Sequence, residues 1–181
     1  MKTYNRNRIQ NITEIALCTA LLSVSSLIVI PLPFSISVLS IHTFAVNIIA
    51  LIMRPASAAC TLLLYLVMGL LGLPVFAGGT AGPDKLFGPT GGFYFGFLVA
   101  VAVMGIVKGK SVDFKRYLLV TLLIGMPIQH FLAILFMCFY NGFNVIGAFF
   151  TISLPFIIGD VVKCVAASLC AVKLNNISVR S

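Results

Sequence analysis

The chain has 181 residues, of which 60% are hydrophobic and only 9% are charged. Soluble domains usually carry about 25% charged residues, and a fold of this size could not bury so much apolar surface in water. We therefore expect lipid to be the solvent, with no room for a large catalytic or nucleotide-binding domain. The net charge of +8 comes without a basic run interleaved with aromatic residues, so we expect no nucleic-acid partner.

Six apolar runs predict six membrane-spanning helices, because each approaches the roughly 20 residues needed to cross a bilayer. The basic start of the chain lacks a small-residue cleavage site, so we expect the first run to be retained rather than removed as a signal peptide. The predicted fold is all-α, a polytopic six-helix bundle forming a single integral-membrane substrate-binding domain over residues 1–181. The predicted spans are 13–30, 36–53, 56–72, 92–107, 117–140 and 155–172.

The basic residues predict the orientation of these spans. With six spans and a cytoplasmic N-terminus, ten of the 12 lysines and arginines fall in cytoplasmic segments, as the positive-inside rule requires. We therefore expect a multi-pass protein of the plasma membrane with both termini in the cytoplasm. The ten residues are Lys2, Arg6, Arg8, Arg54, Lys108, Lys110, Lys115, Arg116, Lys173 and Arg180.

The segment between the third and fourth spans, residues 72–92, is dense in glycine and proline and lies on the outer side in this orientation. It cannot form a regular helix. Its apolar side chains, among them Val75, Phe76 and Phe87, favour an ordered cap over a loose connector. Its glycines allow close approach of the backbone to a ligand. No phosphate-binding P-loop motif is present.

Asp160 and Lys163 are rare residue types for a membrane segment, where one charge costs about 2.5–3.5 kcal/mol at mid-helix. Their spacing places both on one helical face. They form either a self-neutralising packing pair or a ligand site in which the carboxylate accepts N–H groups and the ammonium takes an anionic or carbonyl group. A buried pair adds little stability by itself, which favours the ligand site.

The other polar and reactive residues give weaker indications. His42 and His130 favour packing or hydrogen bonding over catalysis, and an intramembrane enzyme would require His130 to meet Asp160. The five cysteines form no CxxC pair, so we expect ordinary packing thiols and neither a metal site nor disulfides. Ala16 and Ala20 form a strip of small residues that suits either internal packing or a partner helix.

Two segments resemble the BioY family, the biotin-binding S components of energy-coupling factor (ECF) transporters. They are GLPVFAGGTAG with LFGPTGGFYFGF, and the later LPFIIGDVVK. The resemblance implies a six-helix, non-enzymatic protein that captures biotin from outside and needs no cofactor. It also implies a transmembrane T component and two ATPase subunits as partners, with docking through Ala16 and Ala20.

The resemblance implies ligand contacts in these two segments and at His42. Family members often carry Gln where His42 stands, and some carry Arg where Tyr94 stands. The alternatives are an S component for another vitamin, an enzyme using Asp160 and His130, or a structural membrane subunit. The expected ligand-binding residues are Asp160, Lys163, Thr80, Tyr94, Gly79, Thr90 and His42.

Overall fold

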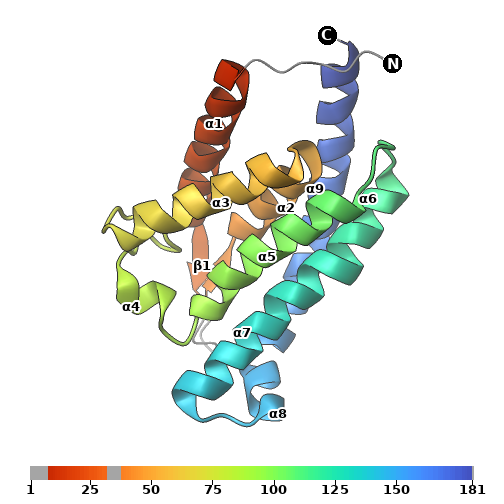
Figure 1. Ribbon diagram of the computed structural model, residues 1–181. Coiled ribbons are helices and arrows are strands. Elements are labelled where there is room, and N and C mark those ends of the chain that lie inside the picture. The colour runs from red at the N-terminus through yellow and green to blue at the C-terminus, as the bar shows by residue number, and fades with distance from the viewer. Residues whose placement is uncertain (1–7, 32–37, 181) are drawn as a thin grey trace.

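The structure, a computed structural model, describes residues 8–31 and 38–180. Within these residues the regular secondary structure is helical, as predicted, apart from a small two-stranded ladder (Figure 1). The longer helices are α1, α2, α3, α5, the continuous α6–α7 segment and α9, and α4 and α8 are single turns. The elements are α1 (Arg8–Leu27), β1 (Val29–Pro31), β2 (Val38–Ser40), α2 (His42–Ile52), α3 (Pro55–Leu70), α4 (Pro83–Leu86), α5 (Gly91–Val107), α6 (Phe114–Val120), η1 (Thr121–Gly125), α7 (Met126–Asn141), α8 (Val145–Ala148), η2 (Phe149–Ser153) and α9 (Leu154–Arg180).

The second predicted span is wrong in its first part. Of residues 36–53, only His42–Ile52 are helical, and Val38–Ser40 instead pair antiparallel with Val29–Pro31. We expected Val29 and Ile30 at the end of the first helix. Residues 36 and 37 lie outside the described part of the chain. β-branched residues favour the ladder, and a proline ends β1. As a helix of 11 residues, α2 is only about 17 Å long, about half the thickness of a bilayer core.

The helices at the other five predicted spans begin and end within a few residues of the predicted positions in most cases. The fifth and the last are clearly longer than predicted. The fifth is one continuous helical segment from Phe114 to Asn141, interrupted by a π-helical turn, η1. Pro127 follows this turn and lacks the N–H needed for a regular helix, which explains the interruption. A second π-helical turn, η2, precedes Pro155 in the same way. The last helix, α9, runs eight residues beyond Val172.

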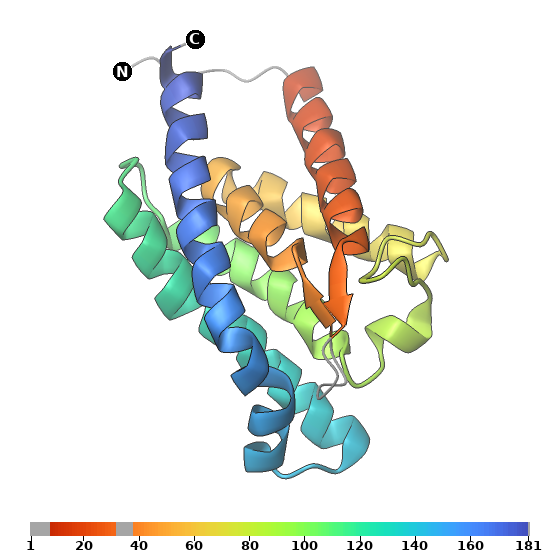
Figure 2. The same ribbon diagram turned by 180° about the vertical axis from the view of Figure 1, so that it is seen from behind.

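Length and hydropathy mark Phe114–Asn141 and Leu154–Ile177 as able to cross a membrane, and α2, α3 and α5 as shorter apolar helices. The start of α1 and the end of α9 lie at the same end of the molecule, together with the α2–α3 and α5–α6 turns (Figure 1). The ladder and α4 lie towards the other end (Figure 2).

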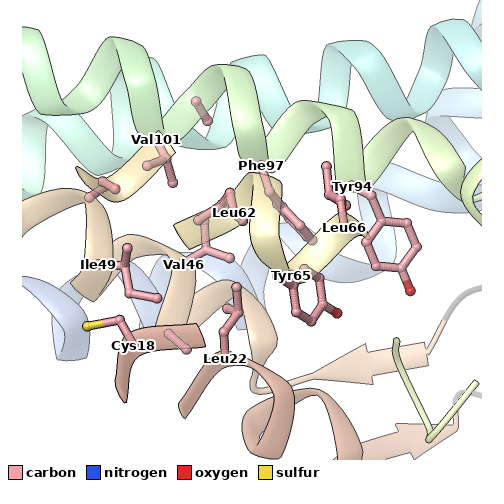
Figure 3. Packing of buried hydrophobic residues seen from close by; sticks show 14 of the residues in the cluster. Cys18, Leu22, Val46, Ile49, Leu62, Tyr65, Leu66, Tyr94, Phe97 and Val101 are labelled. Carbon is pink, nitrogen blue, oxygen red and sulfur yellow. The ribbon is translucent and has the colours of Figure 1, made fainter. Parts of the chain in front are cut away.

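Helix α5 lies at the centre and packs against α2, α3 and α7. Glycines make its approach to α7 possible: a Cβ on Gly92 would lie 2.3 Å from the Leu132 carbonyl oxygen, and one on Gly96 would lie 2.9 Å from the Gln129 Cα. The main core cluster fills the space between α1, α2, α3 and α5 (Figure 3). Along α5, Tyr94 lies nearest the ladder side of this cluster (Figure 3), and its hydroxyl contacts Ala77 of the Gly/Pro-rich segment.

Candidate ligand-binding site

A cavity of about 310 Å³ lies between the Gly/Pro-rich segment, the start of α2, α5 and α9, and its size is in the range of small-molecule sites. Residues from four parts of the chain line it, most of them polar or aromatic. They are Ser40, His42 and Thr43 from the β2–α2 junction; Ala77, Gly78, Thr80, Lys85 and Thr90 from the Gly/Pro-rich segment; Phe93, Tyr94 and Phe97 from α5; and Phe156, Asp160 and Lys163 from α9.

Asp160 is the centre of the polar network in this cavity and is only 7% exposed. Its Oδ1 accepts a hydrogen bond from Lys163 Nζ at 2.9 Å and another from Thr43 Oγ1 at 3.2 Å. Its Oδ2 lies 3.2 Å from His130 Nε2. Three elements, α2, α7 and α9, therefore hold one carboxylate in place. The predicted i, i+3 pair exists and faces the cavity.

This network leaves defined hydrogen-bonding capacity for a ligand. An ionised carboxylate offers about four acceptor positions, and an ammonium offers three donors. Among the described residues, three donors reach Asp160, and Lys163 Nζ donates only to Asp160. One acceptor position on Oδ2 and two donors on Lys163 therefore remain. A ligand group that combines an N–H donor with a carbonyl acceptor matches them.

His42 begins α2 and forms part of an aromatic cluster against the cavity. Its ring centroid lies 5.0 Å from that of Tyr65 and 4.9 Å from that of Phe97. The side chain is 2% exposed, and its Nε2 has no hydrogen-bond partner within the described residues. A buried polar atom without a partner is costly, so a ligand group that bonds to Nε2 would be favoured.

The Gly/Pro-rich segment is anchored from below by tyrosines. Tyr65 Oη donates to the Val75 carbonyl oxygen at 2.8 Å, and Tyr94 Oη accepts from the Ala77 N–H at 3.1 Å. Phe76 is fully buried beneath the segment, and a Cβ on Gly69 would overlap its ring. The segment also contains one helical turn, α4, which the sequence did not predict. These contacts make it an ordered wall of the cavity.

Sequence comparison identifies the protein family of the chain that carries this site. A model of the BioY family matches residues 1–180 of the chain. The chain belongs to the BioY family. A protein of Pyrococcus horikoshii named "Probable biotin transporter BioY" is 33% identical over 169 residues, 92% of this chain and 96% of that protein. The "Biotin transporter BioY" of Thermotoga maritima is 33% identical over 164 residues, covering 89% of this chain and 93% of its own.

A solved structure supports the fold of this BioY-family chain. The crystal structure of the S-component for biotin from an ECF-type ABC transporter is similar with a TM-score of 0.88, at 22% sequence identity. The similarity covers 97% of this chain and 95% of that one. The resemblance found in the two motifs is thus confirmed, and so is the prediction of a transporter rather than an enzyme.

The structure of the BioY-family chain brings most of the predicted site residues together. Asp160, Lys163, Thr80, Tyr94, Thr90 and His42 all line the cavity. Gly79 does not: its backbone N–H donates to the Phe76 carbonyl oxygen in a tight turn with φ of +72°, and its neighbour Gly78 lines the cavity instead. Val75 and Phe76, which favoured an ordered cap, are buried and do not line the cavity, whereas Phe93 of α5 does.

The geometry required for an enzyme is partly present in this BioY-family chain. His130 Nε2 meets Asp160, and His130 Nδ1 lies 3.2 Å from Ser153 Oγ, which completes a Ser-His-Asp chain. However, Ser153 is 0% exposed, and neither it nor His130 lines the cavity. A nucleophile must reach its substrate. We interpret this chain of hydrogen bonds as support for the Asp160 carboxylate.

Several cavity residues were missed by sequence reasoning. Phe156 lies four residues before Asp160, and Phe97 lies four residues after Phe93, so helical spacing alone could have placed both on the correct faces. Thr43 and Lys85 gave no such signal, because their positions depend on how α2 and the Gly/Pro-rich segment fold. Within the described residues no group of three or more His, Cys, Asp or Glu could hold a metal ion, and Cys60, Cys138, Cys164 and Cys170 are free thiols.

Proposed function

We propose that this chain captures biotin as the membrane-embedded S component of an ECF-type transporter. The observation that carries the proposal is the cavity lined by the Asp160–Lys163 ion pair, with Asp160 buried, found in a member of the BioY family. Relatives named biotin transporters support the choice of ligand.

The chemistry of biotin fits the cavity. Its ureido ring presents N–H donors beside a carbonyl, the combination that suits the open acceptor position of Asp160 and the free donors of Lys163. Its thiolane is apolar and would pack against Phe93, Phe97 and Phe156.

The remaining polar residues would complete the binding shell. His42 would bond through its unpartnered Nε2, and the hydroxyl groups of Thr80, Thr90 and Tyr94 would bind or orient the polar ends of the ligand. Gly79 would act through the turn that presents Gly78 to the cavity. No cofactor is needed for binding of this kind.

We further propose that six helical segments cross the plasma membrane, with both termini in the cytoplasm. Arg54, Lys108 and Lys110 lie in or beside the turns at the end that also holds the start of α1 and the end of α9 (Figure 1). The positive-inside rule assigns this end to the cytoplasm. In this arrangement α2 and the ladder together form the second crossing, and the Gly/Pro-rich segment faces outwards.

A T component and two ATPase subunits would supply the energy for uptake. Ala16 and Ala20 are both exposed on α1, between the exposed apolar residues Leu17, Leu21 and Val24. Small residues at this spacing let another helix approach closely. This strip of α1 is therefore the proposed docking surface for the T component.

Competition binding tests the proposal. Detergent-solubilised protein is titrated with radiolabelled biotin, and unlabelled biotin, thiamine or riboflavin is added as competitor. We expect displacement by biotin alone. Displacement by thiamine or riboflavin would assign the cavity to another vitamin, and absence of biotin binding by a folded protein would refute the proposal.

A further inference from the structure

The charges that line the cavity do not balance. Asp160 contributes one negative charge, whereas Lys163 and Lys85 contribute two positive charges, so the cavity carries one surplus positive charge when its histidine is neutral. A ligand with a single negative charge would compensate it. Where the negatively charged group of the ligand binds depends on which of the two lysines is free to pair with it.

The two lysines differ in their surroundings. Lys163 Nζ lies 2.9 Å from Asp160 Oδ1, so a ligand carboxylate bound there would also face the carboxylate of Asp160. Like charges at such distances repel each other. Lys85, in contrast, has no ion pair or hydrogen bond within residues 8–31 and 38–180. Lys85 is therefore the better partner for an anion.

The fold fixes the backbone that carries Lys85 at the cavity wall. It lies in the single turn α4, and the residue after it in that turn, Leu86, is buried in the main core cluster. Two glycines pack against the backbone of this turn: a Cβ on Gly88 would lie 2.3 Å from the Asp84 carbonyl oxygen, and one on Gly91 would lie 2.0 Å from that of Leu86. The turn is thus packed directly against the start of α5.

The two lysines also belong to different sides of the site. Helix α9, which carries Asp160 and Lys163, and α4, which carries Lys85, lie on opposite sides of the β1–β2 ladder (Figure 2). The cavity reaches both. An elongated ligand with a neutral polar head and an anionic tail could therefore contact both sides at once.

We infer that Lys85 binds the carboxylate of the ligand, while Asp160 and Lys163 bind its ureido head. This inference rests on the proposed function, since it concerns biotin in the same cavity. It assigns the valerate tail to the Gly/Pro-rich segment and makes Lys85 a specificity residue for anionic ligands.

Isothermal titration with two ligands tests this inference. Biotin is compared with biotinol, in which an alcohol replaces the carboxylate, on the wild-type chain and on Lys85→Met, Lys85→Arg and Lys110→Met. We expect Lys85→Met to weaken biotin binding about tenfold, which is the lower end of the range for a charged hydrogen bond. Biotinol binding should stay unchanged. Lys85→Arg, which keeps the positive charge, should bind biotin more tightly than Lys85→Met does. The control Lys110→Met, an exposed lysine outside the cavity, should bind both ligands as the wild type does.

A second measurement needs no variant. Because Lys85 is exposed, salt should weaken wild-type binding of biotin more than that of biotinol. Equal losses for both ligands in Lys85→Met, or no loss at all, would overturn the role of Lys85 and leave the proposed function standing. A folded wild-type protein that binds neither ligand would refute the proposed function, and the role of Lys85 with it.

Discussion

Replacement of Asp160 by Asn is the most informative perturbation of the site. The substitution keeps the shape of the side chain and removes its charge, so the Lys163 ammonium loses the carboxylate at 2.9 Å and the ligand loses its open acceptor position. Breaking one partner of a buried, hydrogen-bonded charge pair costs about 2–5 kcal/mol of binding free energy. The dissociation constant for biotin should therefore rise by about 30-fold to several thousand-fold.

The same change also affects folding, so the assay must separate the two effects. Loss of one partner leaves Lys163 unpaired and should lower the melting temperature. The double variant Asp160→Asn with Lys163→Met removes both charges and should recover part of this stability without recovering binding. Isothermal titration with biotin and thermal unfolding are measured on both variants. Wild-type affinity in the single variant, or in a stable double variant, would show that the pair only serves packing and would refute the ligand site.

Three further predictions follow from other parts of the structure. His42→Phe should weaken biotin binding by about 1 kcal/mol, because Nε2 is lost, without lowering the melting temperature, because Nε2 has no partner within the described residues; unchanged affinity would exclude this contact. Gly92→Ala should lower the melting temperature, because its Cβ meets the Leu132 carbonyl oxygen; an unchanged value would contradict the close α5–α7 packing. Ala16→Trp should abolish uptake with the partner subunits but not biotin binding, whereas Ala56→Trp, on exposed α3 surface, should preserve both; normal uptake by Ala16→Trp would move the docking surface elsewhere.

Hydropathy predicted the helices well because lipid-facing segments must be apolar along most of their length. It failed at residues 36–53, where an apolar run is divided between a strand and α2. Strand pairing depends on a partner from another part of the chain, here Val29–Pro31, and hydropathy carries no information on that pairing. The π-helical turns were likewise missed, although Pro127 and Pro155 mark both.

The site was predictable where chemistry was unusual for its surroundings. Asp160 and Lys163 stood out because charges are rare in membrane helices, and their spacing gave their common face. The contacts of Asp160 with Thr43 and His130 join residues 117 and 30 positions apart, so only the tertiary fold brings them together. Lys85 was not predicted as a site residue, since nothing local in the sequence indicates that α4 faces the cavity.

The most direct measurement of the central claim is the identity of the molecule that fills the cavity. Protein purified in mild detergent from cells supplied with several vitamins is denatured, and the released small molecules are identified by mass spectrometry. The account predicts about one biotin per chain from the wild type and almost none from Asp160→Asn. Release of a different vitamin, or equal amounts of biotin from both proteins, would contradict it.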